Sequence, residues 1–307
     1  MSELDDIRAF VEIVDAGSLS RTARRLGLSK SIVSRRLARL EANLGGRLLS
    51  QTTHGISPTE AGAEFKRSAE RILADLEEAC GAVAQRGDEV IGLLRIAVPL
   101  SFGLRHVAPL LVELASRHPK LRIDAAYAER AVDLVADGFD AAIRLGRLKD
   151  SSLIARRIAP IRRAVVASPG YLARHGCPET PGDLARHEFL MRPDQSNSAV
   201  WQFRAGQRLI SVRPEGRFKA DNGEAILQAA IAGLGIAALP TFLVSPSIES
   251  GALVALLPSY PLTEAGLFLV RPPGSPVPGK VRALTDLLLE RFGGEPYWDA
   301  YQMAARR

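Results

Sequence analysis

The chain has 307 residues, of which 47% are hydrophobic and 24% charged. This length suits about two domains, and the composition excludes a disordered or collagen-like protein. The two cysteines, Cys80 and Cys177, lie in different regions, which excludes a disulfide scaffold and a cysteine-based zinc site. The net charge of +6 is uneven, because residues 1–17 carry one arginine and five carboxylates, whereas residues 18–60 carry eight cationic and two acidic side chains. A basic segment that follows an acidic helix indicates a surface for phosphate.

The first 46 residues predict three helices. Apolar residues at helical spacing, from Ile7 to Val14, give the first helix one buried stripe, and Gly17 ends it. A short second helix ends at Gly27, and Ser29 caps a third helix that ends at Gly45-Gly46. A tight glycine-containing turn between two short helices is typical of a helix-turn-helix. The segment Arg47–Ile56, with a turn at Gly55, predicts a small wing.

A fourth, long helix is expected next. Ser57-Pro58-Thr59-Glu60 predicts a capping box with proline at the first helical position, and the helix should run to about Gln85. Its apolar residues recur at spacings of 4, 3, 4 and 3, at Ala69, Leu73, Leu76, Cys80 and Val83. This pattern predicts a short coiled-coil seam, and therefore a homodimer formed through this helix.

From Leu93 onward, short β-rich runs alternate with helical segments. Strands are expected near 93–98, 121–127, 139–145, 154–167, 209–221, 235–239, 252–257 and 266–271. Helices are expected near 103–117, 129–137, 169–175, 223–232 and 277–292. The alternation predicts an α/β region with largely parallel sheets, and its length favours two lobes. The uncharged stretch 225–248 is interrupted by Gly233, Gly235 and Pro240, so we interpret it as a helix, a turn and a buried strand rather than a membrane span.

Four segments together resemble the LysR-type transcriptional regulators. The first is AFVEIVDAGSLSRTARRLGLSKSIVSRRLARLEANLGGRLL, followed by TT, G and SPTEAG. The others are DLVADGFDAAIRLGRLKDSSLIARRI, ADNGEAILQAAIAGLGIAALP and ERFGGEPYWD. The resemblance extends over nearly the whole chain.

The resemblance implies three parts. An all-α winged helix-turn-helix occupies 1–58, a linker and dimerisation helix 59–90, and an α/β effector-binding domain 91–300. The effector domain should resemble periplasmic binding proteins, with lobe I at about 91–162 and 266–300 and lobe II at about 163–265. The chain should cross between the lobes near Pro160–Arg163 and Thr263–Leu267. The family usually assembles as a dimer of dimers, so a homotetramer is implied.

The third helix is the expected recognition helix for double-stranded promoter DNA. Without its buried stripe, it presents Lys30, Ser31, Ser34, Arg35, Arg36 and Arg39. The family motif places DNA contacts at Lys30, Ser31, Ser34 and Arg35. Ser18 and Arg21 are expected to hold phosphates near the start of the second helix. Thr52, Thr53 and His54 of the wing complete the predicted interface, although Gln51 and His54 stand where the family commonly has basic residues.

Helix starts that follow strands are the expected effector site. In α/β folds, ligands lie beyond the carboxyl ends of strands. The candidates are Leu100, Ser101, Phe102, Arg147, Asn222 and Gly223. Helix N-termini combined with an arginine favour a small carboxylate-bearing effector.

Other classes of protein remain as alternatives. An enzyme or a solute-binding module could use the α/β region, but neither needs the basic capped helix and the linker helix behind it. A structural nucleoid-type DNA binder would lack a specific effector pocket. The five histidines show no metal-ligand spacing, and no G-x-S-x-G or P-loop motif occurs. We therefore expect no enzyme activity, metal or cofactor. Since the first ten residues contain no apolar run, we expect a cytoplasmic protein without a membrane partner.

Overall fold

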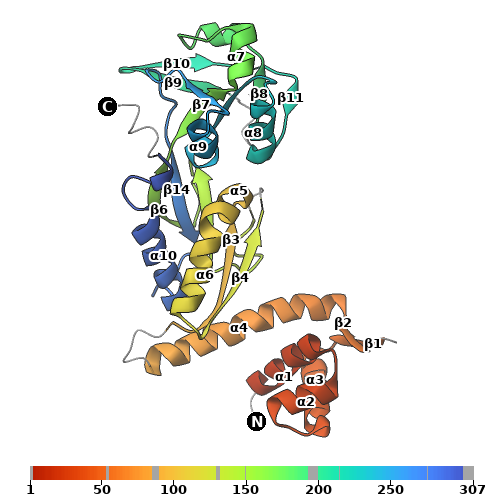
Figure 1. Ribbon diagram of the computed structural model, residues 1–307. Coiled ribbons are helices and arrows are strands. Elements are labelled where there is room, and N and C mark those ends of the chain that lie inside the picture. Colours follow the sequence, from red (N-terminus) through yellow and green to blue (C-terminus); the bar gives the residue numbers. More distant parts are fainter. Residues whose placement is uncertain are drawn as a thin grey trace. The chain divides into compact units, whose positions relative to one another are not determined.

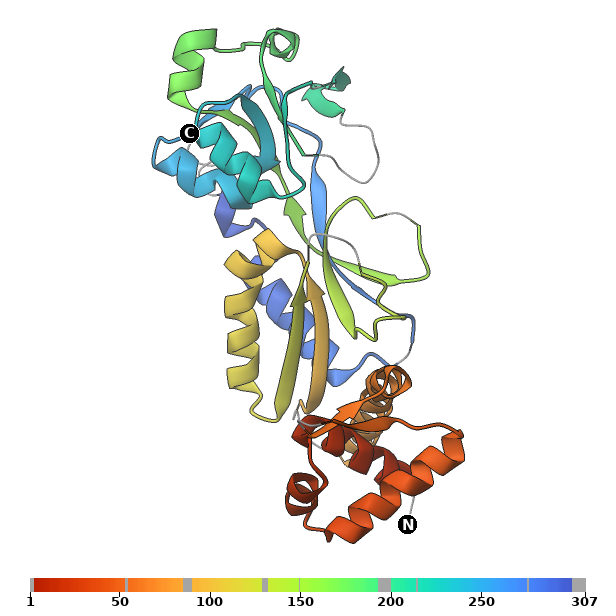
Figure 2. The same ribbon diagram turned by 90° about the vertical axis from the view of Figure 1, so that its right-hand side faces the viewer.

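The computed structural model describes residues 3–52, 55–84, 90–128, 132–148, 150–192, 200–213, 215–274 and 276–299. The chain folds as two compact units, Met1–Leu93 and Leu94–Arg307. Figures 1 and 2 show the elements of each unit from two directions. Within the described ranges, no helix is both long and apolar enough to cross a membrane.

The first unit is a winged helix-turn-helix with a long helix attached. Its elements are α1 (Glu3–Ala16), α2 (Leu19–Leu26), α3 (Lys30–Leu44), β1 (Leu49–Thr52), β2 (Gly55–Pro58) and α4 (Glu60–Ala84). The three predicted helix ends are confirmed, since Gly17, Gly27 and Gly45 have φ of 62°, 64° and 69°, which suit glycine. Phe10, Ile13, Val33, Leu40 and Ala69 lie in one core that joins α1, α3 and α4.

The long helix begins two residues later than the predicted capping box. Ser57 and Pro58 belong to strand β2, which pairs antiparallel with β1. Thr59 is the capping residue instead, and its Oγ1 accepts a hydrogen bond from the Gly62 N–H at 3.0 Å. The pairing of β2 with β1 therefore outweighs the local preference of Pro58 for a first helical position.

Lobe I of the second unit is built on a five-stranded sheet in the order β4-β3-β5-β14-β6. Its strands are β3 (Gly92–Val98), β4 (Leu121–Tyr127), β5 (Ala141–Gly146), β6 (Ile154–Ile161) and β14 (Ala265–Arg271). Its helical elements are α5 (Leu100–Phe102), the π-helical turn η1 (Gly103–Val107), α6 (Ala108–Arg117), α10 (Gly279–Phe292) and the 3₁₀ turn η3 (Tyr297–Asp299). Helices α6 and α10 lie side by side (Figure 1). Loop residues Val132, Phe139 and Leu153 pack against Ala142 and Val270 of the sheet.

Lobe II is built on a second five-stranded sheet, in the order β11-β8-β12-β7-β13. Its strands are β7 (Arg163–Ala167), β8 (Phe189–Met191), β11 (Phe218–Lys219), β12 (Ile236–Pro240) and β13 (Val254–Leu256), with a separate hairpin of β9 (Trp201–Ala205) and β10 (Arg208–Val212). Its helical elements are α7 (Pro169–His175), the 3₁₀ turn η2 (Asp183–Arg186), α8 (Gly223–Ile231) and α9 (Thr241–Glu249). The hairpin residues Trp201 and Phe203 are buried in the core of this lobe.

Two expectations for the α/β region are wrong. The sheets are mixed rather than largely parallel, because β14 runs antiparallel to both β5 and β6, and β7 runs antiparallel to β12 and β13. The chain leaves the first sheet at Ile161 and enters the second at Arg163, so it changes lobes without a helical crossover.

The helix expected over 129–137 is absent from its described part, 132–137. There the Asp133 carboxylate accepts hydrogen bonds from the N–H groups of Val135 and Ala136 and holds a turn.

Candidate functional site

Helix α3 presents an exposed polar face at its N-terminus. The Ser29 Oγ accepts a hydrogen bond from the Ile32 N–H at 3.3 Å and caps the helix, as predicted. Lys30, Ser31, Ser34 and Arg35 are all exposed on the first two turns, whereas Val33 is buried against α1 and α2. Four of the predicted contacts therefore share one accessible face, with donors suited to base edges.

Two further arginines of α3 are held inside the unit. The Arg39 guanidinium donates from Nε and Nη2 to the two carboxylate oxygens of Asp6, at 2.5 Å each. The Asp6 side chain is 2% exposed, so this carboxylate is buried against the arginine. Arg36 lies 3.6 Å from the Asp5 carboxylate, and its side chain is only 14% exposed. Both arginines form ion pairs with α1 carboxylates, which stabilise the packing of α3 on α1. Their contact with DNA stays a prediction.

The remaining predicted contacts lie at the start of α2 and on the wing. Ser18 has extended backbone and makes no capping hydrogen bond with its side chain, and Arg21 is exposed. The wing is tied to this region, since the Ile56 N–H donates to the Gly17 carbonyl at 3.3 Å. Thr52 ends β1, while Thr53 and His54 lie outside the described residues. Ser18, Arg21 and the base of the wing are therefore neighbours in the fold.

The segment Leu100–Phe102 follows strand β3, as expected, but its aromatic ring is not accessible. Phe102 is completely buried, and its ring contacts Phe242 of lobe II at a centroid distance of 5.0 Å and Trp298 at 5.5 Å. The ring therefore fills an aromatic cluster between the lobes, which corrects the expectation that Phe102 contacts an effector. Leu100 and Ser101 are half-buried at the same strand end.

Asn222 and Gly223 form the start of α8 in lobe II. The Asn222 Oδ1 accepts hydrogen bonds from the N–H groups of Glu224 and Ala225 at 2.8 and 3.3 Å, so Asn222 caps the helix. Two residues after Asn222, the Glu224 carboxylate accepts two hydrogen bonds from the Arg105 guanidinium of lobe I, both at 2.9 Å. This bidentate ion pair connects the lobes beside the predicted Asn222 site.

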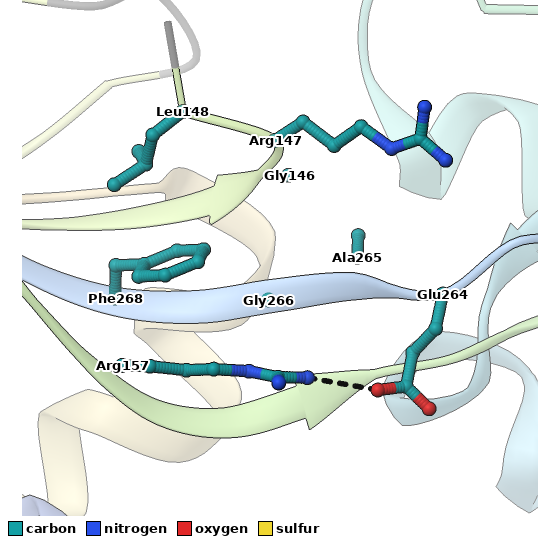
Figure 3. Close-up of a pocket in the computed structure, with 8 residues that line it drawn as sticks. All are labelled: Gly146, Arg147, Leu148, Arg157, Glu264, Ala265, Gly266 and Phe268. Carbon is teal, nitrogen blue, oxygen red and sulfur yellow. Dashed lines mark hydrogen bonds and ion pairs between the residues drawn. The ribbon is translucent and has the colours of Figure 1, made fainter. Parts of the chain in front are cut away.

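Arg147 lies apart from these helix starts, in a pocket on lobe I. The pocket has a volume of about 400 Å³ and is lined by Gly146, Arg147, Leu148, Arg157, Glu264, Ala265, Gly266 and Phe268. Figure 3 shows the Arg147 side chain extending from the end of β5 over Ala265, with Arg157 on the other side of β14. Arg157 donates to the Glu264 carboxylate at 2.8 Å. The six predicted effector residues therefore divide between this pocket and the lobe junction.

A second arginine, Arg162, forms ion pairs at the crossing between the lobes. Arg162 pairs with the carboxylates of Glu295 and Asp299 at 2.6 and 2.7 Å, and its Nε lies 3.5 Å from Glu264. The hydrogen bond to Glu295, and to a lesser extent the one to Asp299, raises the pKa of Arg162, which stays charged. Glu264 therefore connects the pocket to the point where the chain changes lobes.

Sequence reasoning missed Arg105, Arg157, Glu224 and Glu264. Arg105 and Glu224 lie within three residues of a predicted site residue, Arg157 lies inside a predicted strand and Glu264 lies in the predicted crossing, but no local signal distinguishes them from other surface charges. Their partners are 107 or more residues away in sequence, at the Arg157–Glu264 and Arg105–Glu224 pairs. Only an alignment of related sequences or a structure could have joined them.

Comparison with known proteins identifies the family. Residues 4–63 match the model of the bacterial regulatory helix-turn-helix protein, lysR family, and residues 87–293 match the LysR substrate binding domain. The HTH-type transcriptional regulator PtxR of Pseudomonas aeruginosa is 35% identical over 296 residues, covering 96% of this chain and 94% of that protein.

Solved structures agree with this result. The structure of CrgA, a LysR-type transcriptional regulator from Neisseria meningitidis, is 32% identical, has a TM-score of 0.60, and matches over 94% of this chain and 99% of that chain. The full-length structure of the Vibrio cholerae virulence activator AphB, a member of the same family, is 27% identical with a TM-score of 0.58, over the same shares of the two chains.

The winged unit, the long helix and the two-lobed α/β unit thus define a class of bacterial transcription regulators. This chain belongs to the LysR family of DNA-binding transcriptional regulators and carries its effector-binding domain.

Proposed function

We propose that this protein is a sequence-specific DNA-binding transcription regulator of the bacterial cytoplasm. In this proposal, helix α3 lies in the major groove and a small carboxylate-bearing effector, bound between the two α/β lobes, controls the complex. The observation that carries the proposal is the exposed face of α3, where Lys30, Ser31, Ser34 and Arg35 project from the capped N-terminal turns.

Recognition of DNA would divide between bases and phosphates. Arg35 has the fork of donors that binds guanine O6 and N7, and Lys30, Ser31 and Ser34 are close enough on the same helix face to contact adjacent base edges. Ser18 and Arg21 would bind phosphate and fix the position of α3 along the duplex. Thr52, Thr53 and His54 would place the wing against the neighbouring backbone.

Effector control would act at the junction of the lobes. Ser101 and Asn222 lie at helix starts in different lobes, and the Arg105–Glu224 pair joins the same two regions. An anion bound there would interact with donors from both lobes and favour one arrangement of them. For the effector to change DNA binding, it must have a higher affinity for one quaternary state than for the other.

A homodimer formed through α4, paired again into a homotetramer, completes the proposal. Ala69 and Leu73 of the predicted seam are buried in the core of their own unit, whereas Ile72 and Leu76 are 46% and 36% exposed. We therefore assign the partner-facing stripe to Ile72 and Leu76 at its described end. Cys80 and Val83 continue along the same helix, but their side chains lie outside the described ones.

The Arg35→Ala variant tests the recognition role directly. Loss of a bidentate guanine contact typically costs about 1–3 kcal/mol, so the affinity for the specific duplex should fall on the order of tenfold or more. Arg208→Ala removes the same charge from an exposed position in lobe II and is the matched control. Fluorescence anisotropy with the two variants measures both affinities. Equal affinity of the Arg35→Ala variant and the control for the specific duplex would refute the role given to Arg35.

A further inference from the structure

Helix α3, the wing and helix α4 are tied together at the backbone of one residue, Leu48. This residue lies between α3 and strand β1 and is 4% exposed. Its N–H donates to the Glu41 Oε1 of α3 at 2.7 Å. Its carbonyl oxygen accepts a hydrogen bond from the Thr59 N–H, just before α4, at 2.9 Å. We call Glu41, Leu48 and Thr59 the Leu48 node, because they connect the proposed recognition helix to the long helix.

The Glu41 side chain holds the α3 side of the node. Its Oε1 also accepts a hydrogen bond from the Leu49 N–H at 3.2 Å, so one carboxylate oxygen binds two successive backbone donors. Leu48 and Leu49 are both buried, and without Glu41 their N–H groups would lose an acceptor away from water. A charged acceptor makes these hydrogen bonds stronger than neutral ones. Glu41 therefore fixes the position of the wing strand relative to α3.

The Thr59 side chain holds the α4 side of the node. Its Oγ1 lies 2.9 Å from the Arg47 carbonyl oxygen and 3.2 Å from that of Leu48, and it accepts a hydrogen bond from the Gly62 N–H at 3.0 Å. The first turn of α4 also packs on the Leu48 backbone, since a Cβ at Gly62 would come within 1.9 Å of the Leu48 carbonyl oxygen. The start of α4 is thus fixed in position and in direction.

We propose that the Leu48 node sets the angle between α3 and α4 and thereby the spacing of the two DNA half-sites that a dimer accepts. The proposal deepens the proposed function and rests on it, because α3 must bind the major groove and α4 must form the homodimer. Half-sites lie about 34 Å apart, one turn of the duplex, or a multiple of that. A two-fold dimer matches this spacing only if each α3 is held at a fixed angle to its α4. Glu41 and Thr59 are therefore positioning residues, which act without touching a base.

Distances between spin labels measure this angle without DNA. We place one label at Ala38→Cys on α3 and one at Arg71→Cys on α4, because both positions are exposed. The full-length chain is used, with Cys80 and Cys177 replaced by serine. Dilution with unlabelled chain keeps the measured distances within one subunit.

Glu41→Leu and Thr59→Ala should at least double the width of the distance distribution, because each removes one side of the node. Asn43→Leu introduces the same side chain at an exposed position of α3 and is the matched control for Glu41→Leu. Thr59→Ser retains the hydroxyl and is the matched control for Thr59→Ala. Both controls should keep the narrow distribution of the wild type, and thermal unfolding shows which variants retain the fold. An unchanged width in both test variants would overturn the proposal.

Duplexes of different half-site spacing measure the consequence for DNA binding. Hydroxyl-radical footprinting of the wild type on the duplex upstream of its own gene locates the two half-sites. Fluorescence anisotropy then compares this duplex, the same duplex with two base pairs inserted between the half-sites, and one half-site alone. The wild type should bind the lengthened duplex at least tenfold more weakly than the native one, and Glu41→Leu less than threefold more weakly. Affinity for the single half-site should differ less than twofold between the two proteins.

Two results with DNA would overturn the proposal. One is the same spacing preference in Glu41→Leu and the wild type. The other is an equal loss of affinity of Glu41→Leu for all three duplexes, which would leave Glu41 with a stabilising role only. Failure of the proposed function is distinguishable, because the wild type would then fail to discriminate the native from a scrambled duplex or would sediment as a monomer. The distance distribution would remain narrow in that case, and the assignment of half-site spacing would fall with the proposed function.

Discussion

At the scale of single residues, the arginines of α3 have two different roles. The sequence shows them as one basic stretch, and it also shows the five carboxylates of residues 1–17. What the sequence does not show is which of them pair, because helical spacing alone cannot place α1 against α3. The structure shows that Arg36 and Arg39 bind α1 carboxylates, while Lys30, Ser34 and Arg35 face outward. Arg39 should therefore affect stability and Arg35 DNA affinity.

The Arg39→Leu variant tests this division. It leaves the Asp6 carboxylate buried without its partner, so the thermal midpoint of unfolding should fall clearly below that of the wild type. The double variant Asp6→Leu, Arg39→Leu should recover most of the loss, because two apolar side chains need no ion pair in this place. Arg35→Ala should leave the midpoint unchanged. A midpoint that does not move in Arg39→Leu would contradict the role assigned to this pair.

His106 should make stability depend on pH. Burial among the aromatic rings of Phe102, Phe242 and Trp298, together with a smaller effect of the neighbouring Arg105 charge, lowers the pKa of His106 to about 4. The unfolded chain, with a histidine pKa near 6.5, binds the proton first as the pH falls. Stability is therefore complete above about pH 6.5 and is lost progressively as the pH falls toward 4.

Urea unfolding of the wild type and of His106→Phe at pH 7 and pH 4.5 measures this effect. The wild type should lose on the order of 2 kcal/mol more than the variant between the two pH values, a figure reduced from the full shift because the imidazole is partly exposed to solvent. Phenylalanine retains the aromatic packing of the site without a titratable group. An identical loss in both proteins would show that His106 does not carry the pH dependence.

At the scale of elements, local sequence signals predict where the first helices end, whereas long-range contacts determine strand direction and which helix faces are buried. The glycine and serine residues at 17, 27, 29 and 45 act within a single turn, so the ends of α1 to α3 followed from the sequence. The direction of β14 and β7 depends on where the chain crosses between lobes, which no local pattern encodes. Helix α9 was missed because Pro246 lies inside it. The seam on α4 was partly misassigned, since Ala69 and Leu73 pack inside their own unit.

Gly62 fixes the approach of α4 to the wing. A Cβ at this position would come 1.9 Å from the Leu48 carbonyl oxygen, a backbone atom that cannot move aside alone. Gly62→Ala should destabilise the first unit by about 2 kcal/mol or more, in spite of the better helix propensity of alanine. Gly46→Ala meets no atom within 4 Å and is the matched control. If chemical unfolding shows equal stability for both variants, the close packing of α4 against the Leu48 backbone is not required.

At the scale of the whole molecule, the two candidate sites differ in how far the sequence could reach. The proposed DNA-binding face lies on one capped helix, so helical spacing and the family motif were enough to predict its four residues, and all four are exposed in the structure. The effector region is assembled from strand ends, a helix cap and the crossing, whose contacts join residues more than 100 positions apart. Sequence reasoning therefore found Arg147 and Asn222 separately, but it could not show that one lines a pocket while the other caps a helix beside an interlobe ion pair.

The central claim is that the exposed face of α3 reads a DNA sequence rather than only phosphate charge. The most direct measurement is the affinity of the purified protein for the duplex upstream of its own gene and for a scrambled duplex of equal length, across a salt series. Phosphate contacts weaken steeply as salt rises, whereas discrimination by base contacts remains. We predict tighter binding to the native duplex that persists at physiological salt. Equal affinities for the two duplexes that fall together with salt would contradict the account.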